Sequence, residues 1–286
     1  MEKSYVGDGK VVLIAGGGKI YADIAARFCH SNKELDDIIA SPYNKNIVKN
    51  ILNAGHFAAL EFDNFIFGIE GYSRVTEVQL VRKRLASYMI SSGRDERNGK
   101  REYKVVLPKD EGMLKEAYGQ VRLNPSDITI TKYDGNSVLL SELIDADDVS
   151  VRMNCDKTLE LLESFYDSCL ENGVKEEDAR YMKVQGTAFK AIISMNSHAL
   201  LDWFKIRCCE NAQDEIQDLA WKMLMLCKKA APDIFAKAGP NCIATGFCTE
   251  NARQNPACKK AGVVTQEEAI KIVRGIKNVR GKIENN

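Results

Sequence analysis

The chain has 286 residues, of which 45% are apolar, and its 40 basic side chains balance its 40 acidic ones. A net charge of zero gives no bulk attraction to nucleic acid or to an anionic membrane, so neither is expected as a partner. No run reaches the roughly 18 apolar residues of a membrane helix, and the polar N-terminus lacks a signal-peptide apolar stretch. Nine irregularly spaced cysteines are typical of a reducing compartment. We therefore expect a cytoplasmic protein.

The first predicted elements are a short buried strand at 11–15 and a glycine-rich turn at 16–19. A glycine-rich loop before lysine can cradle phosphate, but the P-loop spacing is absent and a plain turn is favoured. A helix is predicted from Pro42 to Ala54, with Ser41 as its N-cap and Gly55 at its left-handed C-terminal position.

A strand and a helix are predicted next. In FDNFIFGIEG the apolar residues alternate, which is typical of a strand. Ser73 then begins a helix that places Gln79 near Arg82 and Lys83 on neighbouring faces. The apolar residues expected on the buried side of this helix are Val75, Val78, Val81 and Leu85.

The second half of the chain is predicted to be mainly helical. Helices are expected at 110–119, 155–173 and 175–194, two more between 196 and 229, and one at 265–276 that opens with a capping box. The core stripe of the helix before Pro232 is Ala212, Ile216, Leu219, Met223 and Cys227. A hairpin is expected around Asp134-Gly135. We predict an α+β fold: one domain, 1–286, with an insertion at about 119–150 and a C-terminal extension at about 240–286.

The stretch RKRLASYMISSGR, residues 82–94, gathers four cations around a Ser-Ser-Gly turn. A solvated basic face is the simplest explanation, and an anion site is the alternative. A nucleotide phosphate needs arginine forks and backbone N–H groups at a turn, which Ser92, Gly93 and Arg94 would supply. Ser92 is also a candidate nucleophile, but no base lies beside it in sequence, so phosphate binding is favoured.

This stretch resembles the Arg-His-Arg-x7-Ser signature of the flavin-dependent thymidylate synthases, with Lys83 in the place of the histidine. Four further stretches resemble other elements of that family and occur in the same order. They are GHFAALEF (55–62), FIFGIEGYSRVTEVQ, EDARYMKVQG (177–186) and MNSHALLDWFKIRCCENAQDEIQDLA. The resemblance covers roughly 10–110 and 150–240. It implies the α+β fold of that family, mainly helical with a small antiparallel sheet, and a homotetramer with sites at subunit interfaces.

The implied reaction is the reductive methylation of dUMP to dTMP with methylenetetrahydrofolate, FAD and NADPH, without an enzyme nucleophile on the uracil. The resemblance implies a dUMP site made of Gln79, Arg82, Ser92, Gly93, Arg94, Arg180 and Arg207. Arg207 is the expected catalytic residue, because a guanidinium at the pyrimidine edge stabilises negative charge as C5 becomes nucleophilic and keeps its own proton. His56 is the second expected catalytic residue.

The resemblance also implies an FAD site, at which this sequence departs from the family pattern. The implied residues are His56, Glu61, Arg82, Lys83, Arg84, Leu85, Asn196, His198, Asp202 and Asn211. Lys83 and Asn211 replace histidines, His198 replaces an arginine and Asp202 an asparagine. The ordinary explanation for His198 and Asp202, four residues apart, is a surface pair on one helix face.

These departures leave two alternative functions open. The chain could modify C5 of another pyrimidine nucleotide such as dCMP, or be a non-catalytic nucleotide-binding subunit. Separately, Cys242, Cys248 and Cys258 number only three and lack the usual zinc-ligand spacing, so a zinc site is a minor alternative and no metal is predicted.

Overall fold

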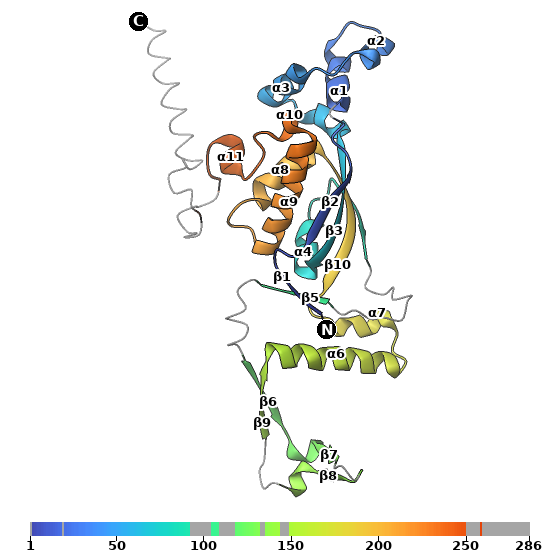
Figure 1. Cartoon of the computed structure of the whole chain (residues 1–286), viewed down its shortest axis with the longest axis vertical. Helices are drawn as coiled ribbons and strands as arrows, with labels where there is room; N and C mark the ends of the chain where they lie inside the picture. The colour runs from blue at the N-terminus through green and yellow to red at the C-terminus, as the bar shows by residue number, and fades with distance from the viewer. Residues whose placement is uncertain are drawn as a thin grey trace, which may run out of the picture.

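The computed structural model describes residues 2–18, 20–91, 104–108, 118–131, 135–143, 149–249 and 258. Its body is a four-stranded sheet in the order β2 (Lys10–Ala15), β3 (Asn64–Ser73), β10 (Ala188–Asn196) and β4 (Ser87–Ile90). Every neighbouring pair is antiparallel. Helices pack against the sheet and at its ends (Figure 1). The α+β prediction with a small antiparallel sheet is therefore confirmed.

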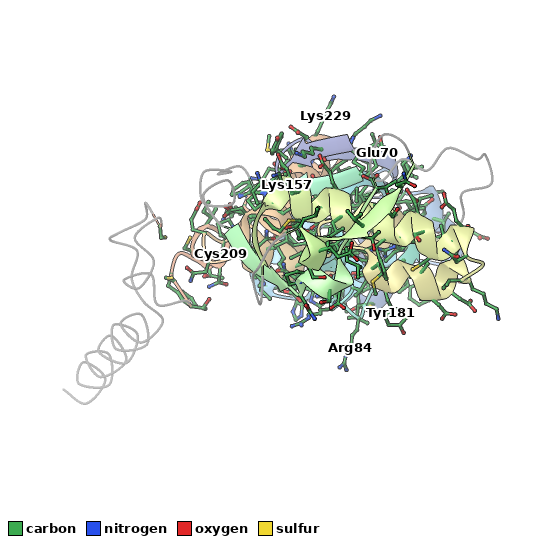
Figure 2. All side chains as sticks on the ribbon, turned by 90° about the horizontal axis from the view of Figure 1, so that it is seen from below. Glu70, Arg84, Lys157, Tyr181, Cys209 and Lys229 are labelled. Atoms are coloured by element: carbon green, nitrogen blue, oxygen red, sulfur yellow. The ribbon has the colours of Figure 1, made fainter. Side chains whose placement is uncertain are left out.

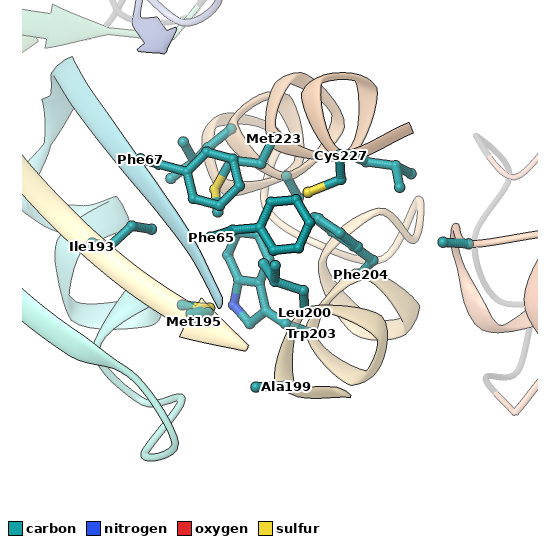
Figure 3. Packing of buried hydrophobic residues seen from close by; sticks show 14 of the residues in the cluster. Phe65, Phe67, Ile193, Met195, Ala199, Leu200, Trp203, Phe204, Met223 and Cys227 are labelled. Carbon is teal, nitrogen blue, oxygen red and sulfur yellow. The ribbon is translucent and has the colours of Figure 1, made fainter. Parts of the chain in front are cut away.

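The main core lies between the sheet and two helices, α8 (Ser197–Arg207) and α9 (Asp214–Ala230). Strand residues alternate between the core and the other face, so Phe65 and Phe67 of β3 pack with Phe204 and Met223 from the helices (Figure 3). Burying each such side chain stabilises the fold by about 1.5–3 kcal/mol. The predicted stripe of α9 is confirmed except for Ala212, which is partly buried and precedes the helix.

The opposite sheet face carries apolar side chains that the single chain leaves exposed. The strand registers place Val12, Gly68, Ile192 and Met89 in one row across all four strands. Val12 is 41% exposed, Ile192 50% and Met89 75%. A row of this kind is typical of a surface that another protein surface covers.

At one end of the sheet lies a group of helices, and the start of one of them differs from the prediction. These are α1 (Ile20–His30), α2 (Leu35–Ala40), α3 (Lys45–Ala54) and the 3-10 turn η1 (Phe57–Phe62); α1 and α2 were not predicted. Helix α3 begins at Lys45 rather than Pro42, because the Asn44 side chain caps it by accepting from the Asn46 N–H at 3.0 Å. Ser41 instead follows the end of α2, whereas Gly55 has the expected left-handed conformation.

The glycine-rich turn after β2 has a packing explanation. Gly16 has φ of +122°, and a Cβ atom there would lie 2.5 Å from the carbonyl oxygen of Asn64. A Cβ on Gly17 would lie 2.9 Å from the Ala230 side chain. Neighbouring atoms thus leave no room for a side chain at either position. Close packing is therefore enough to explain both glycines, which agrees with the prediction of a plain turn.

Helix α4 (Arg74–Leu80) is shorter than predicted, and the face that it packs against the core is not the predicted one. It buries Thr76 and Leu80. The four side chains expected on its buried side are all exposed: Val75, Val78, Val81 and Leu85. The prediction was wrong because a tertiary contact from α9 to Ser73 and Thr76 sets the rotation of this helix.

The predicted helix at 175–194 is also wrong. This stretch contains the short α7 (Glu176–Ala179), the 3-10 turn η4 (Arg180–Met182) and most of β10. Strand β10 pairs with β3 on one side and with β4 on the other, so it is an interior strand. The strand alternates, with Phe189, Ala191, Ile193 and Met195 buried and Lys190 and Ile192 exposed on the other face. The helix prediction missed this period of two, because a short stretch rich in apolar residues can be read as either element.

The remaining elements lie away from this body or cover its ends. Helix α6 (Cys155–Glu171) is confirmed, and α10 (Pro232–Phe235) and α11 (Asn241–Thr245) follow α9. Strands β1 (Glu2–Tyr5) and β5 (Lys104–Leu107) form a parallel pair. Within the described ranges, no helix combines the length and apolar character needed to cross a membrane.

The predicted excursion forms an arm that extends beyond α6 (Figure 1). Strand β6 (Tyr118–Leu123) pairs with β9 (Val149–Asn154), and the expected hairpin is β7 (Thr129–Thr131) with β8 (Ser137–Leu139). Two 3-10 turns flank this hairpin, η2 (Pro125–Asp127) and η3 (Leu140–Glu142). Of the helix predicted at 110–119, Tyr118 and Gly119 are in β6 and the rest lies outside the described residues, as does 265–276. The division into domain, insertion and extension stays a prediction.

Candidate functional site

The first part of the candidate site joins the end of α4 to the end of α8. Arg207, the last residue of α8, donates from Nη1 to the Gln79 side-chain oxygen and from Nη2 to the Gln79 carbonyl oxygen, both at 3.3 Å. Two residues predicted to bind dUMP, distant in sequence, thus meet in the fold. Their contact leaves part of the guanidinium fork available for another acceptor.

Arg82 lies close enough to Arg207 to affect its ionisation. Partial burial, and then repulsion from the Arg82 charge, lower the pKa of Arg207. In the part of the chain that the structure describes, no carboxylate forms an ion pair with either arginine. Two neighbouring guanidinium groups without a countercharge form a site suited to an anion.

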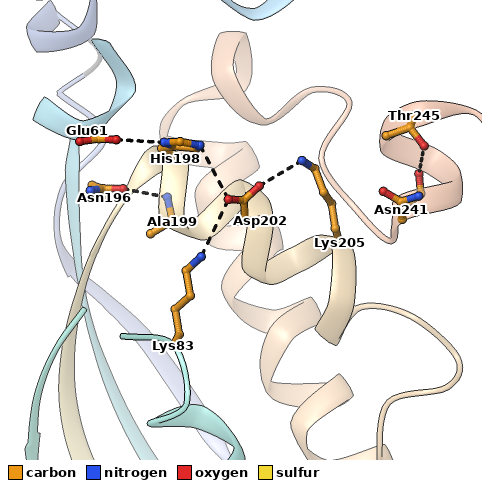
Figure 4. A network of polar contacts seen from close by, with 9 residues as sticks. All are labelled: Glu61, Lys83, Asn196, His198, Ala199, Asp202, Lys205, Asn241 and Thr245. Atoms are coloured by element: carbon orange, nitrogen blue, oxygen red, sulfur yellow. Dashed lines mark hydrogen bonds and ion pairs between the residues drawn. The ribbon is translucent and has the colours of Figure 1, made fainter. Parts of the chain in front are cut away.

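The second part of the site is a network of charged side chains centred on Asp202 (Figure 4). His198 Nδ1 lies 3.2 Å from Glu61 Oε1, and its Nε2 lies 3.7 Å from Asp202 Oδ2. Lys83 Nζ is 3.9 Å from the same Asp202 oxygen. Four residues predicted for the FAD site, drawn from η1, α8 and the segment after α4, therefore gather in one network.

Lys205 belongs to this network and was missed by the sequence reasoning. Its Nζ lies 3.1 Å from Asp202 Oδ1 and 6.0 Å from the centre of the Phe57 ring. The Phe57 ring also packs against His198 at a centroid distance of 5.4 Å. The signal was present in the sequence, because Lys205 follows Asp202 by three residues and so lies on the same helix face.

Asn196 has a structural role in addition to its predicted one. Its side chain caps α8 by accepting a hydrogen bond from the Ala199 N–H at 2.7 Å. The cap fixes the start of the helix that carries His198, Asp202 and Arg207. Asn196 therefore orients three predicted site residues at once.

Other predicted residues lie apart from these two groups within the single chain. Arg180 lies at the junction of α7 and η4, which pack on α6, and the side chains of Arg84 and Leu85 are exposed between α4 and β4. Figure 2 shows Arg84 pointing away from the body. His56, at the start of η1, is exposed. Ser92, Gly93 and Arg94 lie outside the described residues.

A cavity of about 250 Å³ lies beside this site, with Lys205 and Asn211 in its wall. Five cysteines line it: Cys208, Cys209, Cys242, Cys248 and Cys258. Burial raises the pKa of the Cys208 thiol to about 12, so it stays protonated and is a poor metal ligand. Among the described residues, no three His, Cys, Asp or Glu side chains form a group that could hold a metal ion.

Comparison with known proteins places these features in a family. The family described as "Thymidylate synthase complementing protein" matches residues 17–233. A flavin-dependent thymidylate synthase from Geobacter sulfurreducens is 32% identical over 244 residues, which cover 84% of this chain and 89% of that protein. The enzyme of the same name from Pyrococcus furiosus is 34% identical over 236 residues, 80% of this chain and 82% of that protein.

A solved structure shares the fold. It is a UMP/dUMP methylase, PolB from Streptomyces cacaoi bound with 5-Br dUMP, and it matches with a TM-score of 0.60 at 18% identity. The match covers 82% of this chain and 96% of that one. The family match spans most of the chain and the relatives exceed 30% identity, so the resemblance seen in the sequence is confirmed. This chain belongs to the thymidylate synthase complementing proteins, the family of the flavin-dependent thymidylate synthases.

Proposed function

We propose that this protein is a flavin-dependent thymidylate synthase that converts dUMP to dTMP with methylenetetrahydrofolate, FAD and NADPH. The observation that carries the proposal is the pair of guanidinium groups of Arg82 and Arg207, which no carboxylate of the described residues neutralises, beside Gln79 in a chain of this family. A pyrimidine nucleotide supplies the two features that such a pair binds, an anionic phosphate and an electron-rich base edge. Cytoplasmic localisation is part of the proposal, supported by the irregular spacing of the nine cysteines in the sequence.

Arg207 is assigned the catalytic role at the pyrimidine. Its guanidinium is fixed by two contacts to Gln79, so it is held in place before the substrate arrives. A fixed cation at the uracil edge stabilises the negative charge that develops as C5 attacks the one-carbon group. We assign the phosphate to Ser92, Gly93 and Arg94, with Arg82 nearby.

The residues of the network centred on Asp202 fit FAD by their chemistry. The cofactor carries an anionic pyrophosphate, which the ammonium groups of Lys83 and Lys205 can meet; in the single chain both lysines lie against the Asp202 carboxylate. Lys205 also lies over the Phe57 ring. When bound, FAD would supply the reducing equivalents. The proposed set is completed by Glu61, His56, Arg82, Arg84, Leu85, Asn196, His198 and Asn211.

A homotetramer with composite sites is part of the proposal. Two apolar surfaces are exposed in the single chain: the sheet row of Val12, Ile192 and Met89, and the α4 stripe that includes Val78. Covering them with other copies of the chain would remove apolar area from water. Assembly would also bring Arg180 to a site on a neighbouring subunit, from which the single chain separates it.

The test is a spectrum followed by an assay. The purified protein should take up FAD, show a flavin band that shifts when dUMP is added, and form dTMP from dUMP when all three co-substrates are present. Turnover of dCMP in place of dUMP would favour the alternative of a different pyrimidine substrate. Protein that binds dUMP but takes up no FAD would favour the non-catalytic alternative and overturn the proposal.

A further inference from the structure

We infer that Glu215 is a positioning residue for the nucleotide site: its buried carboxylate fixes the first turn of α4, so that Gln79, at the other end of that helix, meets Arg207. The inference rests on the proposed function for the identity of the nucleotide. Glu215 lies on α9, belongs to neither of the two groups described above, and touches neither arginine.

The Glu215 side chain is one of the few buried charged groups of the chain, with an exposed fraction of 2%. Its Oε1 accepts a hydrogen bond from the Ser73 N–H at 2.7 Å. Its Oε2 accepts from the Thr76 hydroxyl at 2.8 Å and from the Ser73 hydroxyl. All of its contacts in the described chain go to the start of α4, and none goes to a cation.

Burying a carboxylate without a cation is costly, so the hydrogen bonds that hold it define a specific geometry. Backbone hydrogen bonds from Arg74 to Thr187 and from Val75 to Gln185 also hold the start of α4, and the Tyr88 hydroxyl holds its end at Leu80. Among its side chains only Thr76 and Leu80 are buried, so the Glu215 contact to Thr76 is one of the few side-chain contacts that fix its rotation. Hydrogen bonds at Ser73 and Thr76 set the direction in which each later residue points, since every residue of a helix turns by a fixed angle.

A second contact from the same turn of α9 holds the other end of α4. Gln213 caps α9, and its Oε1 accepts from the Ile216 N–H at 3.3 Å and from Gln79 Nε2 at 3.5 Å. The first turn of α9 therefore holds α4 at both ends, through Glu215 and through Gln213. Because Gln79 presents two oxygens to Arg207, the orientation of α4 sets the position of the Arg207 guanidinium.

The experiment compares Glu215→Gln with Asp218→Asn as the matched control. Asp218 lies on the same helix and accepts from the Tyr72 hydroxyl at 2.9 Å and from Lys222 at 2.8 Å, without a contact to α4. For each holoenzyme, the KM for dUMP, kcat, FAD content and amide hydrogen exchange of residues 74–80 are measured. Glu215→Gln should raise the KM for dUMP about tenfold and speed exchange in 74–80; Asp218→Asn should change neither.

A second pair of variants covers the case in which Glu215→Gln does not fold. Thr76→Val removes one hydroxyl at nearly constant volume and should raise the KM for dUMP several-fold, whereas Thr76→Ser keeps the hydroxyl and should restore the wild-type value. An unchanged KM in folded Glu215→Gln or in Thr76→Val, even with faster exchange, would reduce Glu215 to a structural role and overturn the inference. Failure of the wild-type enzyme to turn over dUMP would instead refute the proposed function.

Discussion

Lys83 and Asp202 meet in the folded chain with Nζ 3.9 Å from Oδ2. Both are positions at which the resemblance to the family predicts a departure from its pattern. A lysine replaces the signature histidine, and an aspartate replaces an asparagine. Each change alone would add an unbalanced charge to the site. Together they would add one positive and one negative charge that lie side by side, beside Lys205 at 3.1 Å from Asp202 Oδ1, so we expect the two charges to compensate for each other.

This compensation predicts non-additive effects. Lys83→His removes a cation and should weaken FAD binding, Asp202→Asn removes a carboxylate and should strengthen it, and the effect of the double variant should differ from the sum of the two. The coupling energy in the cycle should be about 0.5–1 kcal/mol, since the pair is partly exposed. Flavin fluorescence titration measures the four dissociation constants. Strictly additive effects would show that the two residues act independently.

Replacing Arg207 should affect turnover more than folding. Arg207→Lys keeps the positive charge but loses the planar fork that spans the two Gln79 oxygens, so kcat should fall about 100-fold. The assay is dTMP formation at saturating dUMP, with FAD content measured in parallel. Lys229→Ala, at an exposed position of α9, is the control. A wild-type kcat in Arg207→Lys would remove this residue from catalysis.

Asp63 should make stability depend on pH. This residue is 1% exposed, its carboxylate has no hydrogen-bond partner among the described residues, and burial raises its pKa to about 6. Because the folded-state pKa exceeds the unfolded value of 3.8, ionisation opposes folding. The cost is fully present above pH 6, declines as the pH falls through 6 toward 3.8, and is absent below.

The measurement is the free energy of unfolding of Asp63→Asn and the wild type in urea at several pH values. The variant cannot ionise, so it should be the more stable protein at pH 8, by on the order of 3 kcal/mol. This advantage should disappear near pH 4. A constant difference across that range would mean that Asp63 does not titrate as its burial predicts.

The exposed stripe of α4 predicts the effect of a charge on assembly. Val78 is 50% exposed in the single chain, so Val78→Asp should leave the fold intact while disfavouring burial of this surface in an oligomer. Light scattering of the eluted protein should show a smaller species than the tetramer proposed for the wild type. Ile206→Asp, exposed on α8 and outside both apolar surfaces, is the comparison. A Val78→Asp tetramer would place the interface elsewhere.

Gly16 should be required for packing rather than for anion binding. Gly16→Ala places a Cβ atom against the Asn64 carbonyl oxygen and should destabilise the fold by about 2 kcal/mol or more. Gly55→Ala also has a positive φ but meets no atom within 4 Å, so its cost should be about 1 kcal/mol. The free energy of unfolding of each variant, measured in urea, distinguishes these two costs. Reduced dUMP or FAD affinity with unchanged stability in Gly16→Ala would support a phosphate loop.

The sequence was sufficient to predict those helices and strands that pack one face against the core. The alternation of Phe65, Phe67 and Ile69 predicted β3, and the stripe through Met223 predicted α9, because each buries one face against the same core. It failed at β10, where the alternation of Phe189, Ala191 and Ile193 was taken for a helix, and at α4, whose apolar side chains are exposed. A short apolar stretch can fit either period, and a local pattern does not say which face of an element packs on the core.

By itself the sequence determined the family, through motifs whose residue types and spacing are fixed by the chemistry of their ligands. It also determined the arginine, histidine and acidic residues from which the site is built. Only the tertiary structure decided that Arg207 meets Gln79, that Lys83, His198 and Glu61 share one network with Asp202, and that Glu215 holds α4. These contacts join segments distant in sequence, and their geometry depends on strand register and helix packing, which no local pattern encodes.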